Sequence, residues 1–304
     1  MAGTSVKAAA IDIGTNSMRL LIAESSEDGL HEIGRQTVVT RLGQGVDSTG
    51  ELDPEAMARS LSVLAEYGSE LYSEEVDAVR AVATSAARDA ANRDEFFDAV
   101  DEVLGVSPEL ISGEEEARLA FAGATRVTDE KPALVIDVGG GSTEFVLGHD
   151  TPTYTKSIDI GSVRLTERII PDRPAKPEQV AEARAHVDEL LSELVLPEPP
   201  AAAIGVAGTF TSLAGINLDL EVYDRAAIHG SALSYPDLLS LVDFLAGMTV
   251  AESEAIPSLD PARAPVILGG AVVAVSSLLA LDLDEVHISE QDLLHGIVGE
   301  LLGR

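Results

Sequence analysis

The 304-residue chain contains no cysteine. This absence excludes disulfide bonds, a cysteine nucleophile and thiolate metal sites, and it fits a reducing cytosol. Residues 1–6 also lack a charged segment followed by an apolar one, which is the pattern of a secretory signal. We therefore expect a cytoplasmic protein.

Basic residues are scarce. Lys and Arg number 20 against 52 Asp and Glu, the net charge is −32, and only four of the basic residues are Lys. One explanation is an acidic surface that keeps the protein soluble. The other, which we favour because lysine depletion accompanies the charge, is a halophilic protein in molar salt, where a Debye length of ~3 Å screens self-repulsion. Both disfavour a nucleic-acid partner, because phosphate backbones bind basic surfaces.

Long apolar runs are almost absent as well. Residues 264–281 carry no formal charge, but this run is slightly short for a membrane span of ~20 residues. It also contains a proline, two glycines and two serines. We expect a buried core helix here and no membrane partner.

A repeat organises what the chain does contain. Residues 11–22 (IDIGTNSMRLLI) and 136–147 (IDVGGGSTEFVL) share one pattern at a spacing of 125 residues. The matching positions are Asp12 and Asp137, Gly14 and Gly139, and Ser17 and Ser142. Each copy predicts a strand, a tight polar turn and a second strand, as in a β-hairpin.

The rest of each half predicts a third strand and then alternating helices and strands. In the first half, strands are expected at 32–40, 78–83 and 109–111, and helices at 54–72, 93–104 and 114–124. In the second half, strands are expected at 153–160, 203–206 and 285–288, and helices at 161–169, 177–194, 209–216, 236–247, 266–281 and 292–302. This order predicts an α/β fold of two duplicated domains with mixed sheets, 1–128 and 129–304, whose turns meet across a cleft.

The turns predict phosphate binding. Turns of Gly, Ser, Thr and Asn expose backbone N–H groups and hydroxyls that suit phosphate oxygens. The candidate phosphate-binding residues of the two hairpins are Gly14, Thr15, Asn16, Ser17, Gly139, Gly140, Gly141 and Ser142. A third turn, 205–209, adds Gly208 and Thr209 before a predicted helix.

Carboxylates accompany these turns. Asp12 and Asp137 end the strands that precede them, and Glu144 points to the same face as Ser142. An acidic side chain next to a phosphate-binding turn would repel the phosphate, and a hard divalent cation between them removes this conflict. The three carboxylates are therefore candidate ligands of Mg²⁺, with Mn²⁺ as an alternative.

Other polar residues are ambiguous on spacing alone. Ser112 and Glu115 form a capping-box pattern, so Glu114 and Glu115 are interpreted as a helix start. Arg88 follows a predicted strand, where it would serve a phosphate or a surface ion pair. His229 and His295 lack ligand spacing and are interpreted as structural.

Together these segments resemble the exopolyphosphatase/guanosine pentaphosphate phosphohydrolase (Ppx/GppA) family, within the actin-like, sugar kinase and Hsp70 superfamily. The resemblance covers nearly the whole chain and rests on 12–17 (DIGTNS), 83–88 (ATSAAR), 111–118 (ISGEEEAR), 137–144 (DVGGGSTE), 161–167 (GSVRLTE) and 205–209 (GVAGT). It implies two actin-like ATPase (ribonuclease H-like) domains with mixed five-stranded sheets around an interdomain cleft.

The resemblance also implies roles. Glu116 is similar to the catalytic base that orients water for attack on the terminal phosphorus. Arg88 matches a substrate-contacting arginine, also counted here as catalytic, and Asp137 and Glu144 match magnesium-associated carboxylates, with Asp12 close by. The turns match the phosphate-binding loops.

Two departures from the family pattern stand out. Longer members add a C-terminal HD-type helical domain that has no counterpart here, so we expect the short two-domain form. Many members read Leu-Arg-Glu-Gly near the C-terminus, where this chain has Leu-Leu-His-Gly at 293–296.

The predicted function is release of terminal orthophosphate from inorganic polyphosphate by Mg-assisted attack of water. The sequence leaves guanosine pentaphosphate open as the substrate. A nucleotide-dependent kinase and a non-catalytic actin-like protein are the less favoured alternatives, and homodimer formation is also open.

Overall fold

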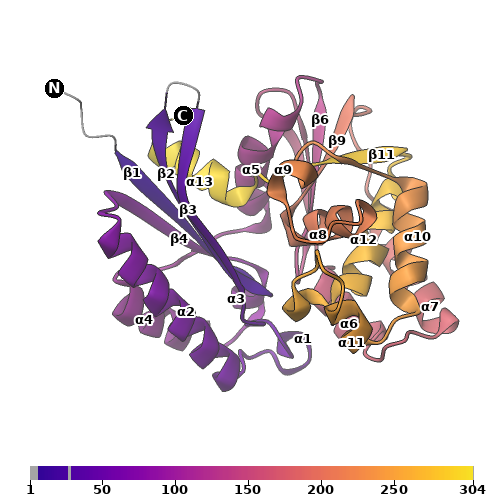
Figure 1. Ribbon diagram of the computed structural model, residues 1–304, viewed down its shortest axis with the longest axis horizontal. Helices are drawn as coiled ribbons and strands as arrows, with labels where there is room; N and C mark the ends of the chain where they lie inside the picture. Colours follow the sequence, from indigo (N-terminus) through magenta and orange to yellow (C-terminus); the bar gives the residue numbers. More distant parts are fainter. Residues whose placement is uncertain (1–5, 27–28, 304) are drawn as a thin grey trace. The chain divides into compact units, whose positions relative to one another are not determined.

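The computed structural model describes residues 6–26 and 29–303, so most of the segment considered for a targeting signal lies outside it. The chain forms two compact units. One runs up to Gly123 and takes in the residues from Leu293 onward, and the other spans Ala124–Asp292. Each unit contains one mixed β-sheet with helices packed on it (Figure 1).

The first sheet has five strands in the order β3-β2-β1-β4-β5. They are β1 (Lys7–Ile13), β2 (Ser17–Ser26), β3 (Gly29–Val39), β4 (Ala78–Ala83) and β5 (Glu109–Leu110). The meander β1-β2-β3 is antiparallel, and β4 and β5 continue from β1 in parallel. The predicted hairpin and third strand of the first half are therefore confirmed.

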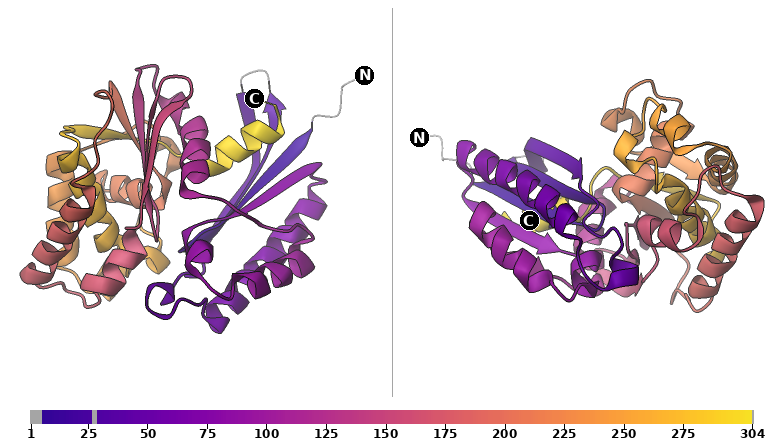
Figure 2. Two further views of the ribbon diagram at one scale, coloured as in Figure 1. Left: turned by 180° about the vertical axis from the view of Figure 1, so that it is seen from behind. Right: turned by 90° about the horizontal axis from the view of Figure 1, so that it is seen from below.

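Helices cover both faces of this sheet. They are α1 (Val46–Thr49), α2 (Pro54–Ser73), α3 (Ser85–Asp89), α4 (Arg93–Leu104), α5 (Gly113–Ala124) and α13 (Leu293–Leu301). Helices α2 and α4 lie on one face, and α5 and α13 lie on the other (Figures 1 and 2). Asp53 caps α2, accepting a hydrogen bond from the N–H of Ala56, and Pro54 follows at the first helical position, as helix starts favour.

The side chains of β1 alternate between the two faces of the sheet, and each face packs against different helices. Ile11 and Ile13 belong to the core shared with α2 and α4, whereas Ala8 and Ala10 belong to the core shared with α5 and α13. Because successive side chains of a strand point to opposite faces, Asp12 lies on the same face as Ala8 and Ala10. The strand therefore directs this carboxylate to the side of the sheet that carries α5.

The second sheet has six strands in the order β8-β7-β6-β9-β11-β10. They are β6 (Ala133–Val138), β7 (Thr143–Gly148), β8 (Pro152–Ile158), β9 (Ala202–Val206), β10 (Ala232–Ser234) and β11 (Glu285–Ile288). Five of these repeat the order of the first sheet. The sixth, β10, was not expected, because three residues antiparallel to β11 leave no periodic signal in the sequence.

The helices of the second unit pack on one continuous core. They are α6 (Ser162–Ile169), α7 (Pro177–Leu191), α8 (Ala207–Asn217), α9 (Arg225–Ile228), α10 (Tyr235–Ala246), α11 (Val250–Glu254) and α12 (Ile267–Ala280), with short 3₁₀ turns at Thr125–Val127 and Pro261–Arg263. Residues 267–278 of α12 are all buried, which confirms a core helix in the uncharged run. Across the described residues, no helix is long and apolar enough to cross a membrane.

The shared strand order confirms the predicted α/β fold with a duplicated arrangement of mixed sheets. Most predicted elements match observed ones within a few residues. The elements that the sequence did not predict are short: α1, α3, α9, α11, β10 and the 3₁₀ turns. Each has too few residues for a hydrophobic period to develop.

The C-terminal helix belongs with the first sheet. The sequence assigned everything after residue 128 to the second domain, but the apolar face of α13 packs against β1, β2 and β4 of the first unit. Leu294 and Ile297 are fully buried there. Gly296 approaches α5 so closely that a Cβ atom would lie 2.0 Å from the carbonyl oxygen of Leu119.

We expect Gly296→Ala to destabilise the protein by about 1–3 kcal/mol, because the added methyl group forces α13 away from α5. Gly247→Ala is the matched control, since its Cβ would have no neighbour closer than 3.7 Å and its φ is −74°. Urea unfolding of both variants measures the difference. Equal stability of the two would contradict the close approach of the two helices.

Candidate active site

The first turn joins β1 to β2. The N–H of Gly14 donates to the carbonyl of Ser17 at 3.1 Å and closes the turn. The carbonyl of Thr15 accepts from the N–H of Gly43, and that of Asn16 accepts from the N–H groups of residues 40 and 41. Because C=O and N–H point in opposite directions across a trans peptide, the N–H groups of Asn16 and Ser17 are directed away from these partners.

Side chains of this turn are tied to the rest of the unit. The hydroxyl of Thr15 accepts from the N–H of Ala86 at 3.2 Å, which links the turn to α3. Asn16 is only 8% exposed, and its side-chain oxygen makes no hydrogen bond to the described residues. A buried acceptor of this kind is typical of a position that binds a ligand or an ordered water.

Asp12 lies opposite Arg19 in the β1-β2 ladder. Nε and Nη2 of Arg19 lie 2.8 and 2.7 Å from Oδ2 of Asp12. Both side chains are nearly buried, at 6% and 11% exposure. The sequence predicted Asp12 as a metal ligand, and in the structure Oδ2 of its carboxylate binds the guanidinium group of Arg19.

Glu116 lies in the first turn of α5, whose start is arranged as the sequence indicated. The hydroxyl of Ser112 accepts from the N–H of Glu115 at 3.2 Å, and the carbonyl of Ser112 accepts from the N–H of Glu116. Nη1 of Arg88 donates to Oε2 of Glu116 at 2.9 Å and to the carbonyl of Ile111 at 3.0 Å. Arg88 and Glu116, predicted from distant motifs, are therefore in direct contact.

Burial raises the pKa of Glu116 to about 7. The nearby charge of Asp12 acts in the same direction, whereas Arg88 and Arg19 oppose it. The side chain is 13% exposed, so water offsets little of the cost of its charge. A carboxyl group with a pKa near neutrality exchanges protons readily at physiological pH.

Glu115 has a different environment. Arg118 donates to both of its carboxylate oxygens at 2.8 Å, and this bonding lowers the pKa of Glu115. Arg118 also donates to Oε1 of Glu300 in α13. Nη1 of Arg80 donates to the other carboxylate oxygen of Glu300 at 3.0 Å. Arg118 therefore links Glu115 of α5 to Glu300 of α13, and this network agrees with the interpretation of Glu115 as structural.

The second turn joins β6 to β7 in the same way as the first. The N–H of Gly139 donates to the carbonyl of Ser142 at 3.0 Å. The carbonyls of Gly139, Gly140 and Gly141 accept hydrogen bonds from the first residues of α6, including Nε of Arg164 at 2.9 Å. By the same peptide geometry, the N–H groups of Gly140 and Gly141 are directed away from α6.

Asp137 and Glu144 are cross-strand partners in the β6-β7 ladder. They are 6% and 1% exposed, and the hydroxyl of Ser157 donates to Oε1 of Glu144 at 2.7 Å. Glu144 occupies the position that Arg19 holds in the first hairpin, 125 residues earlier. The first hairpin thus pairs an acid with a base, whereas the second pairs two acids.

No cluster of three His, Asp or Glu side chains that would hold a metal ion occurs in the described ranges. A site at the second hairpin therefore has two carboxylates to offer. Mg²⁺ fits such a donor set, because it takes oxygen ligands and keeps several waters.

The third turn leads from β9 into α8. The hydroxyl of Thr209 donates to the carbonyl of Val138 at 2.8 Å, which joins this turn to the second hairpin. Ala207 has a left-handed backbone, with φ 63°. Such a conformation is strained for a residue with a Cβ atom.

Gly208 provides room for a guanidinium group. A Cβ atom at this position would lie 1.8 Å from Nη1 of Arg263. The third turn therefore combines the N-terminus of α8 with a positive side chain from a distant loop.

The sequence reasoning missed Arg19 and Arg263. The repeat contained a signal for Arg19, because aligning the two hairpins sets it beside Glu144. No local signal marked Arg263, which reaches Gly208 only through the fold. His295 and His229 have structural partners: Nε2 of His295 lies 3.0 Å from Glu32, and Nδ1 of His229 accepts from the N–H of Glu290.

Comparison with known proteins adds to this geometry. Residues 21–304 match the Ppx/GppA phosphatase family. The chain is 42% identical over 315 aligned positions to exopolyphosphatase 2 of Mycobacterium tuberculosis, and the alignment covers 98% of this chain and 99% of that protein.

Solved structures give the same picture. A Ppx/GppA family member from Aquifex aeolicus has a TM-score of 0.82 at 32% identity, with 99% of both chains covered. An exopolyphosphatase from Cytophaga hutchinsonii has a TM-score of 0.90 at 28% identity, with 98% of both chains covered.

The raised pKa of Glu116 has a consequence for stability. A carboxyl group whose pKa is higher in the folded state favours folding below its unfolded pKa of about 4.5, and this contribution is lost as pH rises through about 7. We expect Glu116→Gln to match the wild type near pH 4.5 and to be more stable above pH 7, by about 2–3 kcal/mol from the linkage relation.

Urea unfolding of both proteins from pH 4.5 to 8 measures this difference and cancels the effects of the other acidic groups. Glu114→Gln, an exposed neighbour in the same helical turn, is the control for removal of a carboxyl group from the start of this helix. A constant offset between wild type and Glu116→Gln at all pH values would contradict the raised pKa.

Proposed function

Because this chain belongs to the Ppx/GppA phosphatase family, we propose that it is an exopolyphosphatase, which releases orthophosphate from the end of inorganic polyphosphate. The observation that carries the proposal is the largely enclosed Glu116, which Arg88 holds at 2.9 Å in the same unit as the first glycine-containing turn. In this arrangement a carboxyl group with a raised pKa lies next to a guanidinium group, which suits the oxygens of a phosphate.

Glu116 is proposed to orient the attacking water and accept its proton. Positioning of this kind needs a side chain with a fixed direction. The hydrogen bond from Arg88 and the start of α5 at Ser112 supply that direction. A pKa near 7 leaves the carboxylate available as a base and lets it return the proton after each turnover.

Arg88 has a second role in this proposal. Its bonds to Glu116 and to the carbonyl of Ile111 are both made by Nη1. The guanidinium carries further N–H donors on Nη2 and Nε, which suit the oxygens of a phosphoryl group in a forked geometry. Arg88 therefore stabilises the charge that develops as the phosphoanhydride bond breaks.

The glycine-containing turns are proposed to bind the phosphate groups of the substrate. Hydrogen bonds on one side of the first two turns direct the N–H groups of Asn16, Ser17, Gly140 and Gly141 to the other side. Convergent N–H groups of this kind bind anions without carrying a charge of their own. Thr15 and Ser142 add hydroxyls, the hydroxyl of Thr209 holds the third turn against Val138, and Gly208 leaves room for Arg263.

A divalent metal ion, with Mg²⁺ the most suitable, fits the second hairpin. Asp137 and Glu144 lie directly opposite each other on antiparallel strands, and their carboxylates would hold the ion. When bound, the ion would neutralise phosphate oxygens and the charge that develops on them. Asp12 is left outside this set, because Arg19 already balances its charge.

The catalytic proposal is tested by phosphate release from polyphosphate and from guanosine pentaphosphate in molar KCl with Mg²⁺. We expect Glu116→Gln to keep its fold and to lose about 10²–10⁴-fold in turnover, as expected for loss of a general base. Glu114→Gln should keep wild-type activity. Unchanged turnover of Glu116→Gln would remove this residue from the mechanism, and faster release from guanosine pentaphosphate would change the substrate assignment.

The metal proposal is tested without any measurement of activity. A ligand that binds only the folded state raises the unfolding temperature in proportion to its occupancy. We expect Mg²⁺ to raise the Tm of the wild type at constant ionic strength and to raise that of Glu144→Gln much less. Glu178→Gln, an exposed acid at the start of α7, should respond like the wild type. Equal shifts in all three proteins would place the metal elsewhere.

A further inference from the structure

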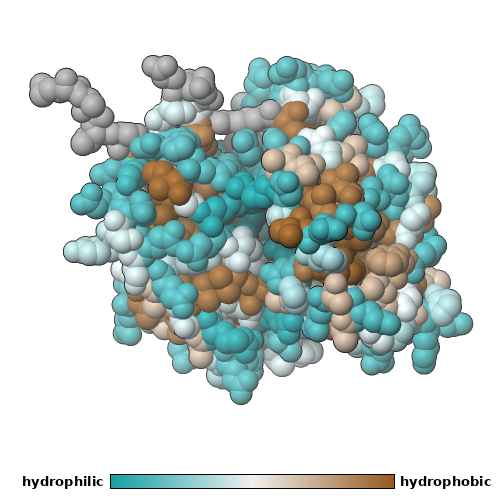
Figure 3. All heavy atoms as spheres, viewed as in Figure 1, coloured by the Kyte–Doolittle hydropathy of each residue, from teal (hydrophilic) through white to brown (hydrophobic). Residues whose placement is uncertain are grey.

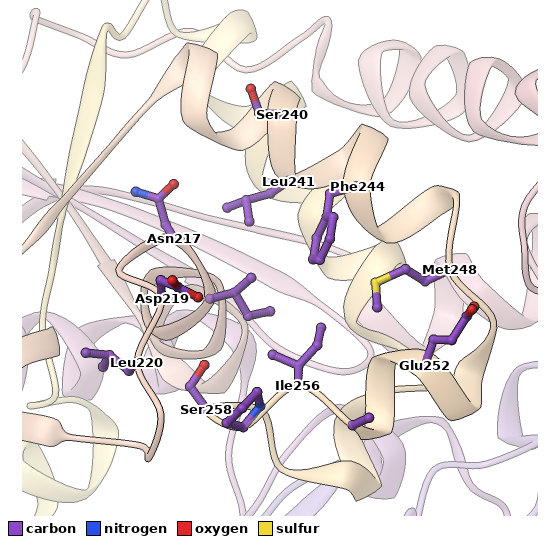
Figure 4. Close-up of a pocket in the computed structure, with 13 residues that line it drawn as sticks. Asn217, Asp219, Leu220, Ser240, Leu241, Phe244, Met248, Glu252, Ile256 and Ser258 are labelled. Carbon is purple, nitrogen blue, oxygen red and sulfur yellow. The ribbon is translucent and has the colours of Figure 1, made fainter.

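The second unit contains a hollow that the proposed catalytic machinery does not use. It has a volume of about 450 Å³ and lies where the end of α8 meets α10 and α11 (Figure 4). Cavities of this size are typical of sites for small organic molecules.

The hollow is separate from the phosphate-binding turn of its own unit. Helix α8 begins at that turn and ends at Asn217, which lines the hollow. At a rise of 1.5 Å per residue, the helix places the two about 15 Å apart. A phosphate bound at Gly208 would therefore not reach the hollow.

Apolar side chains form most of its wall. Leu241, Phe244, Met248 and Ile256 line it, and in Figure 4 the ring of Phe244 points toward the space between them. Phe244 is 50% exposed. Figure 3 shows apolar side chains gathered over α8 and α10 on a surface that is otherwise largely hydrophilic. An exposed apolar surface that lines a cavity is typical of a binding site.

The ionisable groups of the hollow have one sign. Asp219 and Glu252 stand on opposite sides of it in Figure 4, and the described residues that line it include no Lys, Arg or His. The N–H and hydroxyl of Thr249 donate to Glu252 at 2.8 Å, and these hydrogen bonds lower the pKa of Glu252. This carboxylate therefore stays ionised through the physiological range.

We propose that the hollow binds a small organic cation, an amine with a hydrocarbon body. The apolar wall takes the hydrocarbon, and the rim carboxylates attract the ammonium group. The face of Phe244 adds a second favourable contact for a cation. Phosphates and other anions are disfavoured, because the rim and the net charge of −32 repel them.

The proposal is tested with three six-carbon probes that differ only in the charge of the head group. Hexylamine, 1-hexanol and hexanoate are titrated against the full chain in 1 M KCl and followed by ligand-observed NMR. We expect saturable binding of hexylamine in the millimolar range, weaker binding of 1-hexanol and at least tenfold weaker binding of hexanoate. Equal binding of hexylamine and hexanoate would overturn the proposal.

Two variants and one control test whether hexylamine binds in the hollow. Phe244→Ala should weaken hexylamine at least fivefold. Asp219→Asn should weaken it about threefold while leaving 1-hexanol unchanged, and Asn tolerates the left-handed backbone at this position, where φ is 52°. Asp188→Asn on α7 is the control for charge removal at a surface outside the hollow, and hexylamine should bind it as it binds the wild type.

Loss of hexylamine binding in Asp188→Asn to the same extent as in Asp219→Asn would show attraction to the acidic surface alone and would refute the site. Phosphate release by Phe244→Ala should equal that of the wild type. Binding and catalysis are thereby measured separately, and failure of one proposal leaves the other intact.

Discussion

The two-residue alternation of the central strands is the constraint on which the site depends. Within each hairpin, the aspartate one residue before the end of the first strand faces its cross-strand partner, on the face opposite the last residue of that strand. In the first hairpin this geometry joins Asp12 to Arg19 and directs the pair to the side that carries α5 and Glu116. In the second hairpin the same geometry joins Asp137 to Glu144. A difference of one side chain at an equivalent position therefore separates a cross-strand pair of an acid and a base from a cross-strand pair of two acids.

Acting on a polyanion is difficult for a protein of net charge −32, because its overall field repels the substrate. The structure concentrates scarce positive charge where it is needed. Arg19 and Arg88 stand beside Glu116, while Arg164 and Arg263 stand at the second and third turns. All four are arginines, whose forked donors suit carboxylate and phosphate oxygens better than a lysine ammonium does. High salt would screen the long-range repulsion and leave these short contacts largely intact.

Much of this architecture could be predicted from the sequence, because the long strands and helices have clear periods and the hairpin occurs twice. The contact between Arg88 and Glu116 could not be derived from spacing, since it joins segments that the fold brings together, and only a family resemblance indicated both residues. Arg263 was missed for the same reason. The placement of α13 was also missed, because the apolar pattern of a helix does not indicate which of two sheets the helix packs against. The register of the first hairpin sets residue 12 opposite residue 19, so the sequence alone could have identified Arg19 as the partner of Asp12.

The return of α13 to the first unit has a consequence for synthesis of the protein. The core beneath β1 is completed by Leu293, Leu294, Ile297 and Val298, which are translated after the whole of the second unit. On the ribosome, the second unit has its whole core before the first unit has covered one face of its sheet. The first unit, whose strands precede the second unit in the chain, therefore completes its packing only after the second unit has been made, and until then an apolar face is exposed to chaperones or to other nascent chains.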